Sequence, residues 1–201
     1  YSSGGFRQLG NATKPIHVPG DMKGLKWRTT KSPVEFMLVK NWGATPTPYD
    51  WSQLYSGLQS GVVEGQYVAS PWQHVAKLHE VAKYFTEIGG MWSGNILAMD
   101  AKQYNALSSQ EKKWLHEAAD AYGEKVNELD SAWIKNGEDA IKASAKEWYV
   151  PTEAEMTKWR AGAIGAWLDA KGTFEPEVAK RVLLEQGMDG FVAQLEAAGA
   201  L

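Results

Sequence analysis

Cysteine is absent from the 201-residue sequence. Its absence excludes a disulfide framework, a metal site made of thiolates and catalysis by a thiol. A long hydrophobic run is also lacking, because no apolar stretch approaches the ~20 residues that cross a bilayer. Charge of one sign is not in excess either. The formal net charge of −3 gives no general electrostatic case for a nucleic-acid partner.

The first five residues, YSSGG, contain neither the basic start nor the apolar block of a signal peptide. We therefore expect a mature chain, a truncated chain or a cytosolic one, and the residues leave these three open. The composition, 44% hydrophobic and 22% charged, is typical of a folded soluble protein with one large domain or two small ones. Ten tryptophans exceed what a core needs, so we expect some of them to line a ligand cleft or an interface.

The first ninety residues alternate between strand patterns and helix patterns. This spacing favours parallel strand pairs joined by helical crossovers. Asp50 is a good N-cap for a helix in which Trp51, Leu54 and Leu58 share one face. The predicted strands are residues 5–9, 25–29 and 62–68, and the predicted helices are residues 34–42, 51–59 and 71–83.

The second half is mostly helical after a predicted strand at residues 92–99. Ser108 and Glu111 form a capping box, and apolar residues then recur every three or four positions with no proline before Pro151. We expect one helix of about nine or ten turns, with Gly137 as its weak point. Further helices are predicted from Thr152 to near Gly172 and from Pro176 to a break at Gly187.

Catalytic and metal-binding motifs are lacking. No histidine pair has the i,i+4 spacing beside a glutamate that zinc proteases use, and a five-residue gap places His74 and His79 on different faces of the predicted helix. There is no nucleophile elbow, Walker loop or dinucleotide glycine pattern. The four histidines are His17, His74, His79 and His116. The sequence therefore favours binding over catalysis and predicts no metal site.

One strand carries a candidate anchor for an anion. Side chains alternate between the two faces of a strand, so if Leu25 and Trp27 face a core, Lys26 and Arg28 face solvent or a cleft. A guanidinium offers two parallel N–H donors that match a carboxylate, and the pairing is charge-assisted. Arg28 is thus either a solvated surface charge or a carboxylate anchor.

Three segments carry a family resemblance. They are PGDMKGLKWRTT at residues 19–30, GATPTPYDWSQLYSGLQSGVVEGQ at 43–66 and HEVAKYFT at 79–86. In this order and spacing they closely resemble the solute-binding proteins of tripartite ATP-independent periplasmic (TRAP) transporters, most sharply from residue 6 to residue 104. The resemblance implies an α/β, periplasmic-binding-protein-like fold with two lobes, mixed sheets flanked by helices and one long lobe-spanning helix.

The resemblance also implies how the lobes divide. Residues 5–90 and 135–201 are expected to form the second lobe, and residues 91–134 the returning part of the first lobe plus the start of the long helix. Members of the family usually carry about another hundred residues ahead of the counterpart of Phe6. We therefore expect the N-terminal part of the first lobe to be absent from this chain.

The resemblance assigns candidate ligand-binding residues. Arg28 takes the position that grips the ligand's carboxylate, Arg7 that of a second cleft arginine, and Trp51 that of an aromatic wall. From the residues alone, Arg7 also fits a surface charge, Trp51 the first core position of its helix, and Trp92 and Ser93 ordinary core and turn positions. The remaining candidates by resemblance are Gln66, Tyr67, Val68, Trp92 and Ser93.

The pair Tyr67-Val68 departs from the family pattern. Val68 replaces an asparagine that often contacts the ligand, and a metal-assisted branch of the family has Glu-Trp at this point. The acidic metal ligand is missing, so we expect no bound cation and no other cofactor. Apolar and aromatic walls suit an organic acid with an apolar or aromatic body better than a sugar acid, whose hydroxyls need more polar partners.

The function implied is that of a non-enzymatic, periplasmic solute-binding protein. It is expected to capture an organic acid, close its two lobes over it and deliver it to the membrane subunits of a TRAP transporter, with only peripheral membrane contact. Two alternatives remain open. One is an enzyme, such as a lyase or hydrolase that uses Glu64, His79 and Arg28, and the other is a truncated scaffold that binds no ligand.

Overall fold

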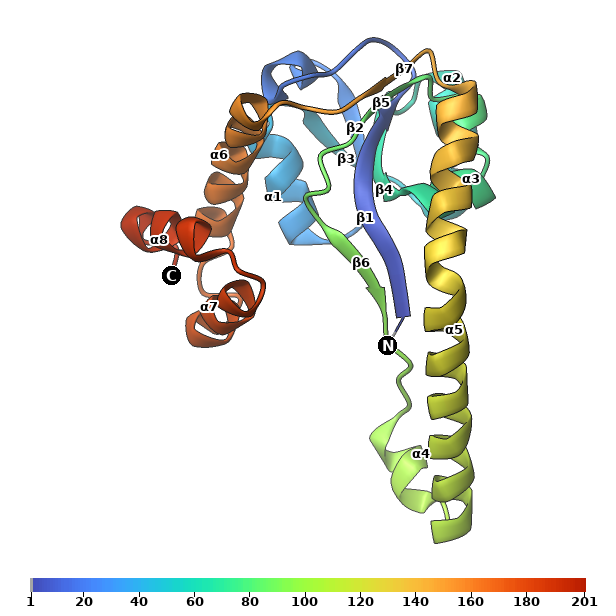
Figure 1. The fold of residues 1–201 in the computed structure, drawn as a ribbon. Helices are drawn as coiled ribbons and strands as arrows, with labels where there is room; N and C mark the ends of the chain where they lie inside the picture. Colours follow the sequence, from blue (N-terminus) through green and yellow to red (C-terminus); the bar gives the residue numbers. More distant parts are fainter. Residues whose placement is uncertain (1) are drawn as a thin grey trace.

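The computed structural model describes residues 2–201 and shows one mixed sheet with helices on both sides and a long helix along one flank (Figure 1). The described strands follow the order β3-β2-β4-β1-β5-β7, and β6 pairs with β1 outside this path. Their bounds are β1 Ser2–Asn11, β2 Lys26–Thr29, β3 Thr45–Pro48, β4 Gly65–Ala69, β5 Tyr84–Thr86, β6 Trp92–Asn95 and β7 Glu147–Tyr149.

The predicted parallel pairs exist, but the middle of the sheet is antiparallel. β2 pairs in parallel with both β3 and β4, and helices α1 (Pro33–Asn41) and α2 (Leu54–Ser60) make the crossovers. β1 is antiparallel to β4, β5 and β6, and β5 is parallel to β7. The sheet is therefore mixed, as the predicted fold class requires.

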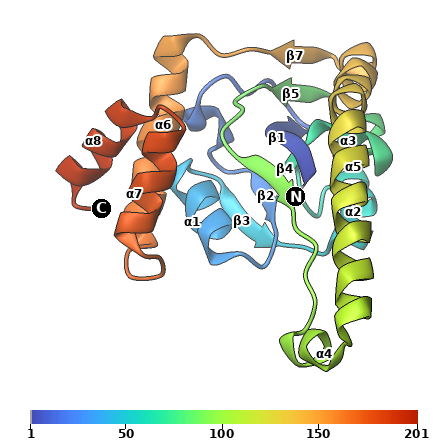
Figure 2. The same ribbon diagram turned by 60° about the horizontal axis from the view of Figure 1, so that its bottom comes forward.

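The helices divide between the two sides of the sheet. α1 packs on α6, with α7 and α8 beyond it, while α3 packs on α5 at the opposite side (Figure 2). The remaining helices are η1 Pro19–Met22, η2 Trp51–Gln53, α3 Ser70–Val75, η3 Leu78–Glu80, α4 Ala101–Ala106, α5 Ser109–Ser144, α6 Glu153–Asp169, α7 Pro176–Glu185 and α8 Asp189–Ala198. None of these described helices is both long and apolar enough to cross a membrane.

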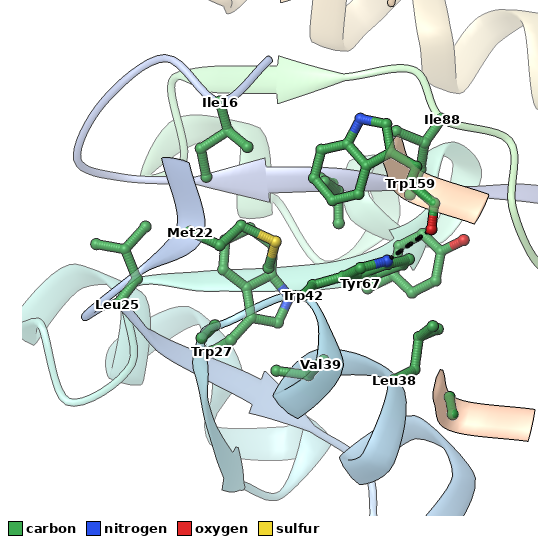
Figure 3. Packing of buried hydrophobic residues seen from close by; sticks show 13 residues of the cluster. Ile16, Met22, Leu25, Trp27, Leu38, Val39, Trp42, Tyr67, Ile88 and Trp159 are labelled. Carbon is green, nitrogen blue, oxygen red and sulfur yellow. Dashed lines mark hydrogen bonds between the residues drawn. The ribbon is translucent and has the colours of Figure 1, made fainter. Parts of the chain in front are cut away.

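The main core lies between the sheet and the α1–α6 side and contains four aromatic rings among aliphatic side chains (Figure 3). The ring of Trp42 meets those of Tyr67 and Trp159 edge-on, at centroid distances of 5.5 and 5.1 Å. Its indole N–H donates a hydrogen bond of 3.1 Å to the carbonyl of Trp159. Trp27 is fully buried, and its ring lies where a Cβ of residue 65 would be, so only glycine fits there. Several of the ten tryptophans are thus core residues.

Helix α5 begins at the predicted capping box, in which the Ser108 side chain accepts from the Glu111 amide. It runs 36 residues, which is ten turns. Its buried residues are Asp130, Gly137 and Ile141, all in the C-terminal half. The N-terminal half extends beyond the sheet together with α4 (Figure 1).

Two predicted elements are shorter than their patterns indicate. The predicted helix at residues 71–83 ends at Val75, because Lys77 adopts a left-handed backbone with φ of 55°. The prediction that His74 and His79 lie on different faces of a helix is therefore wrong: their ring centroids are 5.1 Å apart. The predicted strand at residues 92–99 ends at Asn95. Residues 2–201 show no group of three or more acidic or histidine side chains placed to hold a metal ion.

Candidate functional site

A surface hollow of about 330 Å³ lies where β1, β2, β4 and β6 meet the starts of η2 and α3. Five of the eight predicted site residues line it, namely Arg7, Arg28, Trp51, Val68 and Ser93. They come from five different elements, so the fold gathers residues that are far apart in the sequence. The other residues at its wall are Thr30, Ala69, Trp72, Gly94 and Asn95.

Arg28 faces the hollow from β2 and is only 5% exposed. Its Nε donates to the Tyr49 carbonyl at 3.0 Å, and its guanidinium carbon lies 5.8 Å from the centre of the Trp51 ring. None of the ion pairs found within residues 2–201 includes Arg28. Lys26, two residues earlier on the strand, is exposed instead and donates to the Gly61 carbonyl. Arg28 is therefore not a solvated surface charge, and its role as a carboxylate anchor stays a prediction.

The electrostatics of Arg28 reflect its burial. Burial lowers the pKa of the guanidinium, while the charge of Glu35 raises it and that of Arg7 lowers it. Arginine nevertheless stays protonated in proteins, so the site keeps a cation. A buried cation without an ion-pair partner is unfavourable unless an anion from outside compensates it. The arrangement can therefore accept an anion from outside the chain.

Arg7 enters the hollow from β1 but already has a carboxylate partner. Its Nη1 pairs with Glu35 Oε1 at 3.4 Å, and its Nε donates to Ser93 Oγ at 3.3 Å. Glu35 lies in the first turn of α1, is 2% exposed, and also accepts the Thr30 amide at 3.0 Å. Arg7 is thus a wall residue held in place by an internal ion pair.

Trp51 corrects a prediction about its helix. The pattern places it on the core face with Leu54 and Leu58, yet those two are buried and Trp51 is 42% exposed. The reason is that residues 51–53 form a 3₁₀ turn ahead of α2, whose different rotation per residue takes Trp51 off that face. Its ring consequently lies beside Arg28. Val68, on β4, adds an apolar wall.

Three predicted site residues, Gln66, Tyr67 and Trp92, do not line the hollow. Gln66 is fully buried and donates to Gln73 Oε1 at 2.6 Å. Tyr67 follows Gln66 on β4 and so faces the opposite side, in the aromatic core, where burial raises the pKa of its hydroxyl. Trp92 is half exposed, and its indole N–H donates to Ser3 Oγ.

Several residues at the site were not singled out by sequence patterns. Thr30 lies two positions after Arg28, so strand alternation could have placed it on the same face. Trp72 lies in the first turn of α3, and its ring meets that of Trp133 edge-on at 5.1 Å. Nothing in the sequence indicates that Glu35 belongs to the site, because an acidic residue in a first helical turn is already explained by the helix dipole.

Comparison with known proteins identifies relatives for most of the chain. The family model described as "Bacterial extracellular solute-binding protein, family 7" matches residues 1–171. The "Ectoine-binding periplasmic protein TeaA" of Halomonas elongata is 31% identical over 136 residues, which are 68% of this chain and 40% of that protein. The "C4-dicarboxylate-binding periplasmic protein DctP" of Vibrio cholerae is 30% identical over 152 residues, 71% of this chain and 45% of that one.

Solved structures show the same fold. The ectoine-binding protein of the TeaABC TRAP transporter of Halomonas elongata has a TM-score of 0.76 at 26% identity and covers 96% of this chain and 61% of its own. A TRAP periplasmic solute-binding protein of Sulfitobacter sp. with bound β-D-galacturonate has a TM-score of 0.78 at 19% identity. These likenesses confirm the predicted fold class. The chain matches less than half the length of the two curated relatives and about three fifths of the TeaABC structure.

Proposed function

Because the chain belongs to family 7 of the bacterial extracellular solute-binding proteins, as its motifs predict, we propose that it captures an organic acid for a TRAP transporter. In this proposal the protein works in the periplasm and delivers the acid to the transporter's membrane subunits. Relatives are named for ectoine, 2,3-diketo-L-gulonate and C4-dicarboxylate binding, and each name includes "periplasmic". The observation that carries the proposal is Arg28, a buried guanidinium at the wall of the hollow that forms no ion pair with any described residue.

The chemistry of capture follows from that placement. Arg28 lines the hollow, and its Nε is engaged by the Tyr49 carbonyl, so its remaining N–H groups are the donors for a carboxylate. Trp51 lies beside the guanidinium, and Val68 and Trp72 line the hollow, so the body of the acid meets apolar and aromatic walls. These walls support a ligand with an apolar or aromatic body.

We further propose the lobe division that the resemblance implies. Residues 5–90 and 135–201 form the second lobe, and residues 91–134 belong to the first lobe. Most of the hollow's wall then comes from the second lobe, and residues 93–95 add the first lobe's part. The half of α5 that extends beyond the sheet supports this division, as does the part of the TeaABC structure that this chain does not match. Capture then consists of closure of the two lobes over the acid, without covalent chemistry.

The alternative of an enzyme has less support. It relies on Glu64 and His79 acting together with Arg28, but of these three only Arg28 lines the hollow. Glu64 accepts a hydrogen bond from the Lys26 amide, and His79 follows α3 beside His74. Turnover of an organic acid by the purified protein would revive that alternative.

The test is acid binding by the full-length protein, measured by thermal shift and calorimetry against a panel of carboxylic acids. Arg28→Ala should weaken binding by about 30-fold or more, since removing one partner of a buried charge pair costs about 2–5 kcal/mol. Arg28→Lys keeps the charge but loses the two-pronged donor, so it should weaken binding as well. Lys26→Ala, an exposed neighbour on the same strand, is the matched control and should bind normally.

Unchanged affinity in a folded Arg28→Ala variant would overturn the proposal. The scaffold alternative predicts a different pattern, in which no acid raises the melting temperature of residues 1–201 although the full-length protein responds.

A further inference from the structure

We propose that Glu35 sets the charge of the ligand. By compensating Arg7 it leaves Arg28 as the one cation of the hollow that forms no ion pair within residues 2–201, so this site takes a monocarboxylic acid. This inference rests on the proposed function and deepens it, because it names the class of acid. Arg7 and Arg28 line the same hollow, yet they differ in what surrounds their guanidinium groups.

Glu35 is fixed where it stands. Its side chain is 3% exposed, and Oε2 accepts hydrogen bonds from both the amide and the hydroxyl of Thr30. Its position in the first turn of α1, capped by Ser32, adds the favourable field of the helix N-terminus. With Oε2 engaged by Thr30, Oε1 is directed at Arg7. The carboxylate cannot turn into solvent without breaking these contacts.

Two nitrogens of the Arg7 guanidinium already have partners within the chain. Glu35 Oε1 lies 3.4 Å from Nη1, and Nε donates to Ser93 Oγ. Arg7 can still donate a hydrogen bond into the hollow, but its charge is already balanced by a buried carboxylate. A ligand carboxylate placed against Arg7 would meet the field of Glu35 as well, which opposes a second negative charge.

Arg28 has no comparable partner. Two acidic residues raise its pKa by their charge: Glu35, which is paired with Arg7, and Asp50. The side chain of Asp50 is 68% exposed and pairs with Lys31 at 3.9 Å, so water screens it. Two guanidinium groups and one buried carboxylate leave the hollow with one net positive charge. A second carboxylate on the ligand would enter this hollow without a counter-charge, which is strongly unfavourable in a closed site.

The experiment compares matched acids on the full-length protein by calorimetry. Benzoate and terephthalate share a ring and differ by one carboxylate, and butanoate and butanedioate share a four-carbon chain. The wild type should bind each monocarboxylate at least about tenfold more tightly than its dicarboxylate partner. Glu35→Gln, which preserves shape and frees the charge of Arg7, should reduce that preference by about tenfold or reverse it.

Two further variants serve as controls. Glu35→Asp keeps the negative charge and should keep the wild-type preference for monocarboxylates. Glu117→Gln makes the same change in net charge on the exposed face of α5, far along the chain from the hollow, and should change nothing.

The outcomes separate this inference from the proposed function. A wild type that prefers the dicarboxylates, or a folded Glu35→Gln variant with unchanged preference, overturns the role of Glu35 while leaving acid capture intact. If Glu35→Gln does not fold, the wild-type preference decides alone. Binding of none of the four acids, nor of any other carboxylic acid in the panel, removes the proposed function and this inference with it.

Discussion

At the scale of single residues, Glu155 is a carboxylate whose pKa is strongly lowered by its neighbours. Its Oε2 accepts hydrogen bonds from the Tyr149 hydroxyl at 2.7 Å and from the amide and hydroxyl of Thr152, each at 2.8 Å. These contacts, that of Tyr149 above all, lower the pKa of Glu155 from 4.5 to about 2. Because Tyr149 lies on β7 and Thr152 caps α6, the same carboxylate joins the strand to the helix.

The sign of the resulting pH dependence follows from the lowered pKa. As the pH falls below 4.5, Glu155 becomes protonated in the unfolded chain, whereas in the folded chain it stays ionised until about pH 2. The stability that Glu155 contributes is therefore fully present above pH 4.5 and is lost as the pH falls from 4.5 to about 2. Glu155→Gln should therefore have a lower urea midpoint than the wild type at pH 7. It should also lose less stability on acidification, so that the two midpoints converge near pH 2.

Tyr149→Phe is the matched control for this prediction. It removes the hydrogen bond that lowers the pKa of Glu155 most. Its urea midpoint should therefore fall with pH less than that of the wild type and more than that of Glu155→Gln. Parallel midpoint curves for the wild type and Glu155→Gln between pH 7 and pH 2 would contradict the assignment of this window to Glu155.

Individual site residues were predictable where strand alternation decides the matter. Alternation places Trp27 in the core and Arg28 on the other face, and the structure agrees. The same rule explains why the neighbours Tyr67 and Val68 cannot both line one hollow, although resemblance assigned them together. The pairing of Glu35 with Arg7 could not be predicted from a local pattern, because it joins residues 28 positions apart in the sequence.

At the scale of elements, two glycines of α5 have opposite surroundings. A Cβ on Gly137 would lie 2.7 Å from the Cα and 2.8 Å from the nitrogen of Pro71, both backbone atoms of α3. A Cβ on Gly123 would have no neighbour within 4 Å outside its own helix. The sequence marks Gly137 as a weak point of the helix, but the structure shows a close approach that lets α3 pack on α5.

We therefore predict opposite effects for the same substitution in one helix. Gly137→Ala should destabilise the protein by about 1–3 kcal/mol, because backbone atoms of α3 must move away. Gly123→Ala should stabilise it by up to about 1 kcal/mol, because alanine is the better helix former and meets nothing. Thermal or urea unfolding of both variants checks this. A stabilised Gly137→Ala would show that α3 and α5 are not in close contact.

Helix starts were predictable from sequence, whereas some helix ends were not. Capping boxes at Ser108 and Thr152 specify the first residues of α5 and α6 to within one position. The end of α3 depends on Lys77, a non-glycine in a left-handed conformation, with neither glycine nor proline to indicate a break. Such a residue is held in place by its tertiary surroundings, which no local pattern contains.

At the scale of the whole molecule, the class of the fold was predictable and the central pairing was not. Alternating helices and strands indicate the parallel pairs of β2 with β3 and β4. The antiparallel pairs of β1 join residues as far apart as Ser2 and Asn95, and nothing in a local pattern specifies such partners. That the sheet is mixed was predicted by the family resemblance of the three motifs and not by the periodicity.

The N-terminal half of α5 presents an apolar surface that this chain leaves uncovered. Residues 109–129 include no buried side chain, and Trp114, Tyr122 and Leu129 are each more than half exposed. Their spacings of eight and seven residues are close to two turns, so the three fall on one side of the helix. A helix of this kind gains most of its stability from packing of its apolar face.

If residues 91–134 belong to the first lobe, as we propose, the remainder of that lobe covers this surface in the full-length protein. Amide hydrogen exchange measured by mass spectrometry then has a definite expectation. In the chain of residues 1–201, amides of residues 109–129 should exchange much faster than those around Ile141, which is buried against the sheet side. In the full-length protein the protection of residues 109–129 should rise toward that of the C-terminal half, whereas residues 137–144 should change little. Equal protection of residues 109–129 in both chains would contradict the lobe division, because no covering element would then be needed to hold that half of the helix.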